Sequence, residues 1–329
     1  MQKCVGLTGG DGLLGSNVIR ELLQRGYRVR VFRQPERASL TLAGLAIEEV
    51  YGDILRPDTL STAFQGCDYV IHAAASTRIW PSRDPASRRV NIEGTRNVLN
   101  AARDAGVERL IYVGTANTYG AGSKADPGSE ARPYAGAVYG LDYMDSKQEA
   151  QELVMQYVAD GLPALVVNPT FMIGPYDATP SSGALIRSIA LGLVPGYTRG
   201  GRNYIAVKDA AVGIANALTM GRVGQGYILG HENMSYKEAF TRIASVLGVR
   251  PPRHYIPSGL VLVGGLLGSI TGTLLGRAPK VSWAMARIAC DEHYYTPRKA
   301  VDELSLPQSS LDDAIRECYD WLHKHNYLA

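Results

Sequence analysis

Short apolar runs alternate with longer amphipathic stretches through the first half of the chain. Each run is partly β-branched, which favours a strand, and the stretch after it has apolar positions at helical spacing. This alternation predicts an α/β fold, with a doubly wound parallel sheet that carries helices on both faces. The expected strands are residues 4–7, 28–32, 47–51, 67–71, 110–113 and 164–167, and the longest expected helices are residues 84–105 and 142–159.

A glycine-rich turn separates the first expected strand from the first helical stretch. It satisfies two spacings at once, G-x-G-x-x-G over Gly10, Gly12 and Gly15 and T-G-x-x-G-x-x-G from Thr8. Glycine permits backbone angles that a Cβ forbids and lets a diphosphate approach the main chain, while the N-terminus of the next helix faces the phosphates. The turn therefore predicts a Rossmann dinucleotide site. Its expected cofactor contacts are Gly9, Gly12, Leu13, Leu14 and Gly15.

The strand–helix alternation weakens after Gly174-Pro175. We therefore expect a dinucleotide-binding Rossmann domain over residues 1–175 and a smaller, mostly helical substrate-binding region over residues 176–329. Some strands and helices of this second region are expected to return to the Rossmann core. Apolar positions at helical spacing over residues 311–328 predict a closing amphipathic helix.

Residues 257–276 contain no charged residue and carry glycines in a repeated small-xxx-small pattern. The stretch is long enough to raise the question of a membrane span. An isolated span late in such a catalytic fold would be unusual, so we expect a tightly packed helix that roofs the substrate cleft, and no integral span. Contact with a membrane interface is the alternative.

The residue at the end of the second expected strand bears on the choice of cofactor. A fold that binds NAD usually places an acidic residue there, whereas Arg33 suits the 2′-phosphate of NADP through a charge-assisted fork, with Arg37 as a second candidate contact. Asp11, inside the phosphate turn, argues mildly for NAD unless it caps the helix. NADP(H) is favoured, with NAD(H) as the alternative.

Further cofactor contacts are expected where the third and fourth strands end. The carboxylate of Asp53, followed by Ile54, is placed to accept the adenine amino group, or else to cap the helix near Asp58. The small residues Ala73, Ala74 and Ala75 let a cofactor lie on the sheet edge. His72 before them reads as a core or supporting histidine rather than a catalyst.

A tyrosine and a lysine four positions apart, Tyr143 and Lys147, point to one face of the helix over residues 142–159. A neighbouring cation lowers the pKa of a phenol, which suits a general acid in carbonyl reduction. Thr115, at the end of the fifth strand, offers a hydroxyl for the substrate oxygen. The same spacing recurs at Tyr204 to Lys208 and Tyr295 to Lys299. Only Tyr143 follows a strand-five hydroxyl at the head of a helix in the cofactor half.

The order of these motifs resembles that of the extended short-chain dehydrogenases/reductases, the NAD-dependent epimerase/dehydratase superfamily, over nearly the whole chain. The matching pieces include residues 8–15, 52–53, 73–75, 91–99, 115, 119–120, 143, 147, 168–169, 174–175 and 207–209. The chain is most similar to the dihydroflavonol 4-reductase-like and hopanoid-associated epimerase-like members. The resemblance implies a catalytic triad of Thr115, Tyr143 and Lys147, cofactor contacts at Asn91, Pro169 and Met172, and a homodimer built through the two long helices.

Substrate contacts are expected from loops beyond the sheet edge. The candidates are Arg78, Trp80, Asn117, Tyr197 and Arg199. If Arg199 and Arg202 grip a diphosphate, the substrate is a nucleotide sugar. Otherwise the aromatic and aliphatic candidates favour a hydrophobic ketone or aldehyde. The first hypothesis is an NADP(H)-dependent carbonyl reductase, the second a nucleotide-sugar epimerase or dehydratase with retained NAD, and the third a non-catalytic cofactor sensor.

The amino-acid composition gives no support for several other kinds of protein. The 329 residues are 46% hydrophobic and 20% charged with a net charge of +3, which gives no case for nucleic acid. The four cysteines show no paired spacing and the six histidines no ligand motif, so we expect reduced thiols and no metal site. The first apolar run is too short for a secretory signal, and we expect a cytoplasmic protein.

Overall fold

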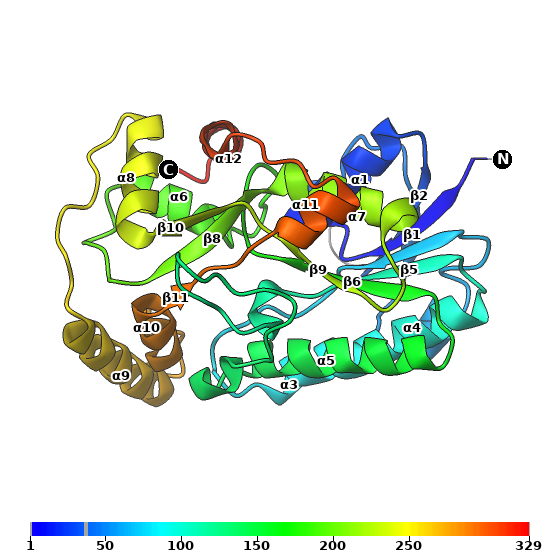
Figure 1. Ribbon diagram of the computed structural model, residues 1–329, viewed down its shortest axis with the longest axis horizontal. Coiled ribbons are helices and arrows are strands. Elements are labelled where there is room, and N and C mark those ends of the chain that lie inside the picture. Colours follow the sequence, from blue (N-terminus) through cyan, green and yellow to red (C-terminus); the bar gives the residue numbers. More distant parts are fainter. Residues whose placement is uncertain (1, 36–38, 329) are drawn as a thin grey trace.

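A seven-stranded parallel sheet forms the centre of the computed structural model, which describes residues 2–35 and 39–328 (Figure 1). The strand order is β3-β2-β1-β4-β5-β6-β9, and every neighbouring pair is parallel. The strands are β1 (Cys4–Thr8), β2 (Arg28–Arg33), β3 (Glu48–Tyr51), β4 (Tyr69–His72), β5 (Arg109–Val113), β6 (Ala164–Pro169) and β9 (Gly226–Leu229). The predicted strands are confirmed, with bounds that shift by one or two residues.

Helices cover both faces of this sheet, because its strands are apolar on both sides. One face packs against α1 (Leu13–Gln24), α7 (Val207–Met220) and α11 (Arg298–Leu304), and the other against α2 (Pro57–Leu60), α4 (Thr95–Asp104) and α5 (Asp142–Ala159). Successive residues of β4 show the alternation: Ile71 belongs to the first core and Val70 to the second. The predicted doubly wound α/β fold is therefore confirmed.

The strand order reverses between β1 and β4, and such a switch point is where open α/β sheets bind ligands. Here the turn after β1 meets the chain after β4. Gly9 has a φ of +74°, and a Cβ on it would lie 2.6 Å from the Ala74 nitrogen. The glycine is therefore required both by its backbone angle and by the approach of the neighbouring strand.

The helix predicted over residues 84–105 is divided into three pieces. Asp84 caps α3 (Pro85–Arg89) by accepting a hydrogen bond from the Ala86 N–H at 3.1 Å. One turn of π-helix, η1 (Val90–Gly94), then leads into α4. Such single π turns are frequent at functional sites, and this one contains Asn91, a predicted cofactor contact.

A smaller region lies beside the C-terminal ends of the sheet strands (Figure 1). Its four-stranded sheet consists of β7 (Phe171–Ile173), β8 (Gly201–Ala206), β10 (Glu232–Ser235) and β11 (Glu292–His293), and β8 pairs with the other three. Its helices are α6 (Gly183–Ala190), α8 (Tyr236–Leu247), α9 (Ser258–Leu275), α10 (Trp283–Cys290) and α12 (Leu311–Lys324). The predicted closing helix is α12. The later elements α7, β9 and α11 lie on or in the first sheet, and the domain boundary at residue 175 stays an interpretation.

Candidate active site

The turn after β1 leaves a helix N-terminus open. Gly12 is the N-cap of α1, with no side-chain cap and no acidic residue in the first turn. The N–H groups of Leu13, Leu14 and Gly15 are therefore the unpaired donors of a helix start. The suggestion that Asp11 caps this helix is wrong, since Gly12 holds that position. Among the described residues a Cβ on Gly12 would meet only the Gly9 carbonyl oxygen, at 3.7 Å, so the turn offers room and donors that fit a diphosphate.

Arg33 stands at the end of β2, where the sequence predicts a contact to the adenosine part of the cofactor. Its side chain is 9% exposed, and Nη1 lies 2.6 Å from Oε1 of Glu49. The other carboxylate oxygen of Glu49, Oε2, accepts from the Tyr51 hydroxyl at 2.6 Å. Asp53 uses one carboxylate oxygen to accept from the Leu55 N–H at 2.9 Å, rather than to cap α2, whose N-cap is Arg56. Arg37 lies outside the described residues.

Buried hydrogen bonds link the ends of β1 and β4 to the π turn. The Thr8 hydroxyl accepts from the Ala74 N–H at 3.2 Å and lies 2.7 Å from Nδ1 of His72, and Nε2 of His72 lies 3.0 Å from the Thr95 hydroxyl. Thr95 in turn donates to the Asn91 carbonyl at 2.6 Å. His72 is thus a supporting residue, as expected. The Asn91 amide donates to the Ser76 carbonyl and to the Ser146 hydroxyl, which ties η1 to the loop after β4 and to α5.

Two buried histidines make the fold sensitive to acid. Burial lowers the pKa of His72 to about 3 and that of His293 to about 4, from an ordinary value of 6.5. Between pH 6.5 and 4 the unfolded chain binds these protons and the native chain does not. We therefore expect the free energy of unfolding to decrease as the pH is lowered through this window, by up to about 1.4 kcal/mol per pH unit for each histidine.

Chemical denaturation at several pH values measures this slope. In the variant H72Q the slope is expected to be shallower by up to about 1.4 kcal/mol per pH unit, because one group that takes up its proton only in the unfolded chain is removed. The exposed His254 provides the matched control, H254Q. A slope that H72Q leaves unchanged would show that His72 is not held neutral in the native state.

The three predicted catalytic residues come from the loop after β5, where Thr115 is the N-cap of a short 3₁₀ turn, and from α5. Tyr143 lies on the first turn of α5, and burial raises the pKa of its phenol, whereas the Thr115 hydroxyl and the Arg202 charge act to lower it. Lys147, one turn further on, donates from Nζ to the Val113 carbonyl at 2.7 Å and lies 4.4 Å from the centre of the Tyr112 ring. Burial lowers the pKa of Lys147 to about 7. In this geometry the Lys147 amine donates to a backbone carbonyl, and Arg202 is the cation that acts to lower the pKa of the Tyr143 phenol. The lowering of that pKa by Lys147 stays a prediction.

A buried amide fixes the loop that carries Thr115. Asn168, near the end of β6, donates to the Thr115 carbonyl at 3.1 Å, to the Thr118 hydroxyl at 3.1 Å and to Oε1 of Gln151 at 2.7 Å. The short 3₁₀ turn η2 (Ala116–Thr118) is thereby held against α5. This holds Thr115 and Tyr143 in a defined relation, which a catalytic pair needs.

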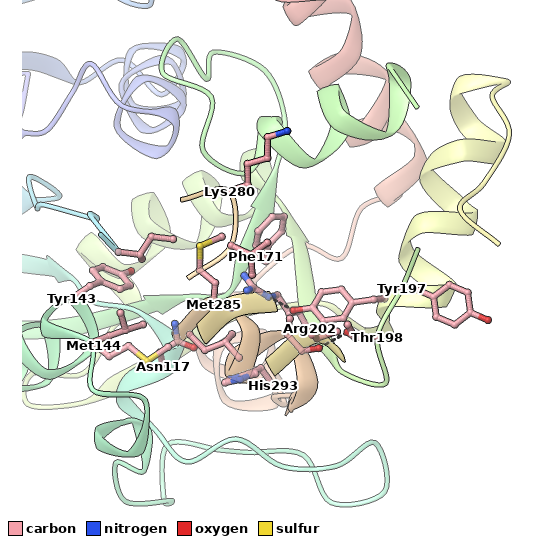
Figure 2. A pocket seen from close by; sticks show the side chains of 18 of the residues that line it. Asn117, Tyr143, Met144, Phe171, Tyr197, Thr198, Arg202, Lys280, Met285 and His293 are labelled. Atoms are coloured by element: carbon pink, nitrogen blue, oxygen red, sulfur yellow. Dashed lines mark hydrogen bonds between the residues drawn. The ribbon is translucent and has the colours of Figure 1, made fainter. Parts of the chain in front are cut away.

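A cavity of about 870 Å³ opens beside Thr115 and Tyr143 (Figure 2). Much of its wall is apolar, with Ile79, Leu141, Met144, Phe171, Val194, Phe240, Ile256, Val261, Val281, Met285 and Ile288 among the lining residues. Polar groups are fewer and include Asn117, Arg202, Asn203, Lys280 and His293. A mostly apolar cavity with a few convergent polar groups is typical of a small-molecule site.

The structure brings some of the predicted contacts into this cavity and leaves others outside. Asn117, Tyr197 and Pro169 line it together with Thr115 and Tyr143, whereas Lys147 is buried behind them and is not among the lining residues. Arg199 instead donates to the Cys290 carbonyl at 3.0 Å, and Trp80 lies against Gly272 of α9. Arg78 is an exposed residue of the loop after β4, and Met172 in β7 packs against the core on the α1 side. None of these last four is among the lining residues.

The sequence suggests Arg202 only as a ligand for a diphosphate and does not single out His293. Nε of Arg202 donates to the Tyr236 hydroxyl at 2.8 Å, and its guanidinium carbon lies 5.3 Å from the centre of the Phe171 ring. Within residues 2–35 and 39–328 no carboxylate pairs with Arg202. The only feature of the sequence that points to Arg202 is the pair of glycines before it. His293 lies in the two-residue strand β11, which no sequence pattern predicts.

Fold and site together define a nicotinamide-dependent oxidoreductase of the Rossmann class. The sequence profile of the NAD dependent epimerase/dehydratase family matches residues 5–230. A Synechocystis sp. protein named "Putative dihydroflavonol 4-reductase" is 34% identical over 335 residues, covering 100% of this chain and 97% of that protein. Sterol demethylase protein B of Methylococcus capsulatus is 29% identical over 98% of this chain and 99% of its own length. The crystal structure of gox2253 superimposes with a TM-score of 0.87 at 31% identity, over 100% of both chains.

The chain therefore belongs to the NAD dependent epimerase/dehydratase family. It is an enzyme of the extended short-chain dehydrogenase/reductase type, and the resemblance to dihydroflavonol 4-reductase-like members is confirmed. Membership in this family of enzymes argues against the third hypothesis, a non-catalytic sensor.

Proposed function

We propose that the enzyme reduces a hydrophobic ketone or aldehyde with NADP(H). The observation that carries this proposal is the position of Tyr143 and Thr115 in the wall of a large, mostly apolar cavity. Such a wall desolvates an aliphatic or aromatic substrate favourably, because much of it is apolar. The names of the two sequence relatives, a dihydroflavonol reductase and a sterol demethylase protein, agree with an apolar substrate.

The cofactor, when bound, supplies the hydride for the carbonyl carbon. Tyr143 donates the proton that the carbonyl oxygen requires, and Thr115 holds that oxygen by a hydrogen bond. A phenol whose pKa is raised by burial is protonated at neutral pH, which is the form a proton donor needs. Lys147 and the open start of α1 would hold the cofactor, Asn91 positions the loop after β4 against α5, and Asn168 keeps the Thr115 loop in place.

A substrate screen tests this proposal directly. Ketones and aldehydes of increasing apolar size are mixed with the purified protein and NADPH, and the absorbance of the reduced cofactor is followed. We expect activity that rises with the apolar size of the carbonyl compound. Turnover of nucleotide sugars with no turnover of any carbonyl compound would contradict the proposal.

Arg33 is expected to select NADP(H) by binding the 2′-phosphate. Replacing it in R33Q removes a charge-assisted fork, so we expect the KM for NADPH to rise about tenfold or more while the KM for NADH changes little. Arg28, at the opposite end of β2, provides the matched control R28Q. Equal effects on both cofactors, or none, would show that Glu49 retains Arg33 and that the preference has another origin.

A second candidate function is a nucleotide-sugar epimerase or dehydratase with retained NAD. The observation that favours it is the part-buried Arg202, which faces the cavity without a carboxylate partner among the described residues and suits an anionic group on the substrate. An enzyme that oxidises and re-reduces one substrate keeps its cofactor. Nucleotide released on denaturing the fresh protein would favour this candidate, and its absence would favour the reductase.

The expected setting is the cytoplasm, with a homodimer as the expected assembly. Cys4, Cys67, Cys290 and Cys318 are free thiols, which supports a reducing compartment. The family resemblance alone supports the dimer. Light scattering of the purified protein tests it.

A further inference from the structure

Helix α9 differs from an ordinary surface helix because its small residues face the protein and most of its large apolar residues face outward. The face it directs to the rest of the molecule consists mainly of glycines. A Cβ on Gly265 would overlap Ala286 of α10, one on Gly268 would overlap the Val281 carbonyl, and one on Gly272 would lie 2.9 Å from the Arg277 carbonyl oxygen. These glycines allow α9 to lie close against α10 and the segment before it (Figure 1).

Seven of the nine large apolar side chains of α9 point away from the molecule. The exposed fraction of these seven side chains runs from 47% for Leu266 to 78% for Leu274. The other five are Leu260, Val263, Leu267, Ile270 and Leu275. The exposed Trp283 adjoins this helix, because its backbone N–H donates to the hydroxyl of Ser269 in α9 at 2.7 Å. A contiguous apolar patch of this kind marks a surface that something else covers.

The charged residues in the chain segments before and after α9 indicate what kind of surface covers it. Between residues 239 and 290 the chain has no Asp or Glu but six basic residues, Arg242, Arg250, Arg253, Arg277, Lys280 and Arg287. Only Arg242 is paired with carboxylates, those of Glu232 and Asp312, within the described part of the chain. Arg253 precedes α9 and Arg277 follows it, and both are exposed. Cations that flank an apolar helix complement the anionic lipids of a membrane surface.

We propose that α9 docks the enzyme on an anionic membrane surface, with its leucine face immersed in the lipid interface. A second copy of the chain is the less favourable occupant, because two such faces would bring unpaired cations together. A membrane span is also disfavoured. Although α9 is long and apolar enough for one by length and composition, with a mean hydropathy of 1.7, its glycine face is packed against α10.

The inner side of α9 also belongs to the active-site cavity. Val261, Gly264, Gly265, Gly268 and Thr271 line the space that contains Tyr143. Docking would place one wall of this cavity at the lipid interface, so that an apolar substrate dissolved in lipid reaches Tyr143 with little exposure to water. The docking itself does not depend on which carbonyl compound is reduced.

Vesicle co-sedimentation of the full-length protein tests the proposal without any turnover. The vesicles consist of phosphatidylcholine alone or of equal parts phosphatidylcholine and phosphatidylglycerol, at low and at physiological salt. We expect binding to the anionic vesicles that weakens as salt rises. In L267Q/L274Q binding should fall about tenfold or more, because two apolar side chains that would insert into the lipid interface are lost. R253Q/R277Q should weaken binding to the anionic vesicles and change binding to phosphatidylcholine little.

The matched control is M220Q/V223Q, which replaces two similarly exposed apolar residues at the end of α7. This control should bind like the original protein, and melting curves of all variants check folding. The proposal is overturned if the original protein stays in the supernatant with both kinds of vesicle, or if L267Q/L274Q binds as well as the control. Dimers that L267Q/L274Q dissociates, with no vesicle binding, would assign α9 to a second copy instead.

Discussion

Replacing Tyr143 by phenylalanine is expected to lower kcat by about 10²- to 10⁴-fold, because the carbonyl oxygen loses its proton donor. The KM for the cofactor should change little, since the phenol hydroxyl is not among the groups expected to hold the dinucleotide. Stopped-flow or steady-state reduction of the best substrate from the screen measures both quantities. Melting curves should stay close to those of the original protein, because the ring that packs against Leu141 and Met144 is retained.

Tyr197 provides the control for this experiment. It lines the same cavity, and Y197F removes one hydroxyl from the same wall. We expect Y197F to alter kcat by less than about tenfold, as for a residue that only contacts substrate. If Y143F and Y197F lower kcat equally, the loss reflects the shape or polarity of the cavity and Tyr143 is not the proton donor.

The sheet and its helices could be read from the sequence because their signal is local. Strands buried on both faces are continuous apolar runs, as in β4 and β6, and the glycine turn after β1 is fixed by its spacing. The helix expected over residues 84–105 shows the limit of this approach. The π turn at Asn91 does not break the apolar period, so only the coordinates reveal that the helix is interrupted there.

Much of the cavity wall could not be predicted, because the contacts that form it are tertiary. Arg202, His293 and Met285 come from β8, β11 and α10, and they meet only after the second sheet has formed. The interaction of Lys147 was also beyond the sequence. Spacing puts it on the face of Tyr143, but whether its amine reaches the phenol or a backbone carbonyl depends on the packing of α5 against β5. Helical spacing restricts which residues share a face and leaves their partners open.

Two glycine substitutions in the phosphate turn should separate stability from cofactor binding. In G15A the new Cβ would overlap the Gly9 carbonyl oxygen, so the turn must open. We expect a loss of about 1–3 kcal/mol in the free energy of unfolding, typical of overpacking, together with loss of cofactor affinity. In G12A the new Cβ meets nothing closer than 3.7 Å within the described chain, and Gly12 has a φ of −78° that alanine adopts readily.

G12A should therefore unfold within about 1 kcal/mol of the original protein, since only the N-cap residue changes. Its cofactor affinity should nevertheless fall about tenfold or more, because the methyl group stands where the main chain must approach the diphosphate. Titration of the cofactor by fluorescence and denaturation by urea measure the two effects on the same samples. Unchanged cofactor affinity in G12A would mean that the diphosphate does not pass over this turn, and the assignment of the open start of α1 as the phosphate site would be wrong.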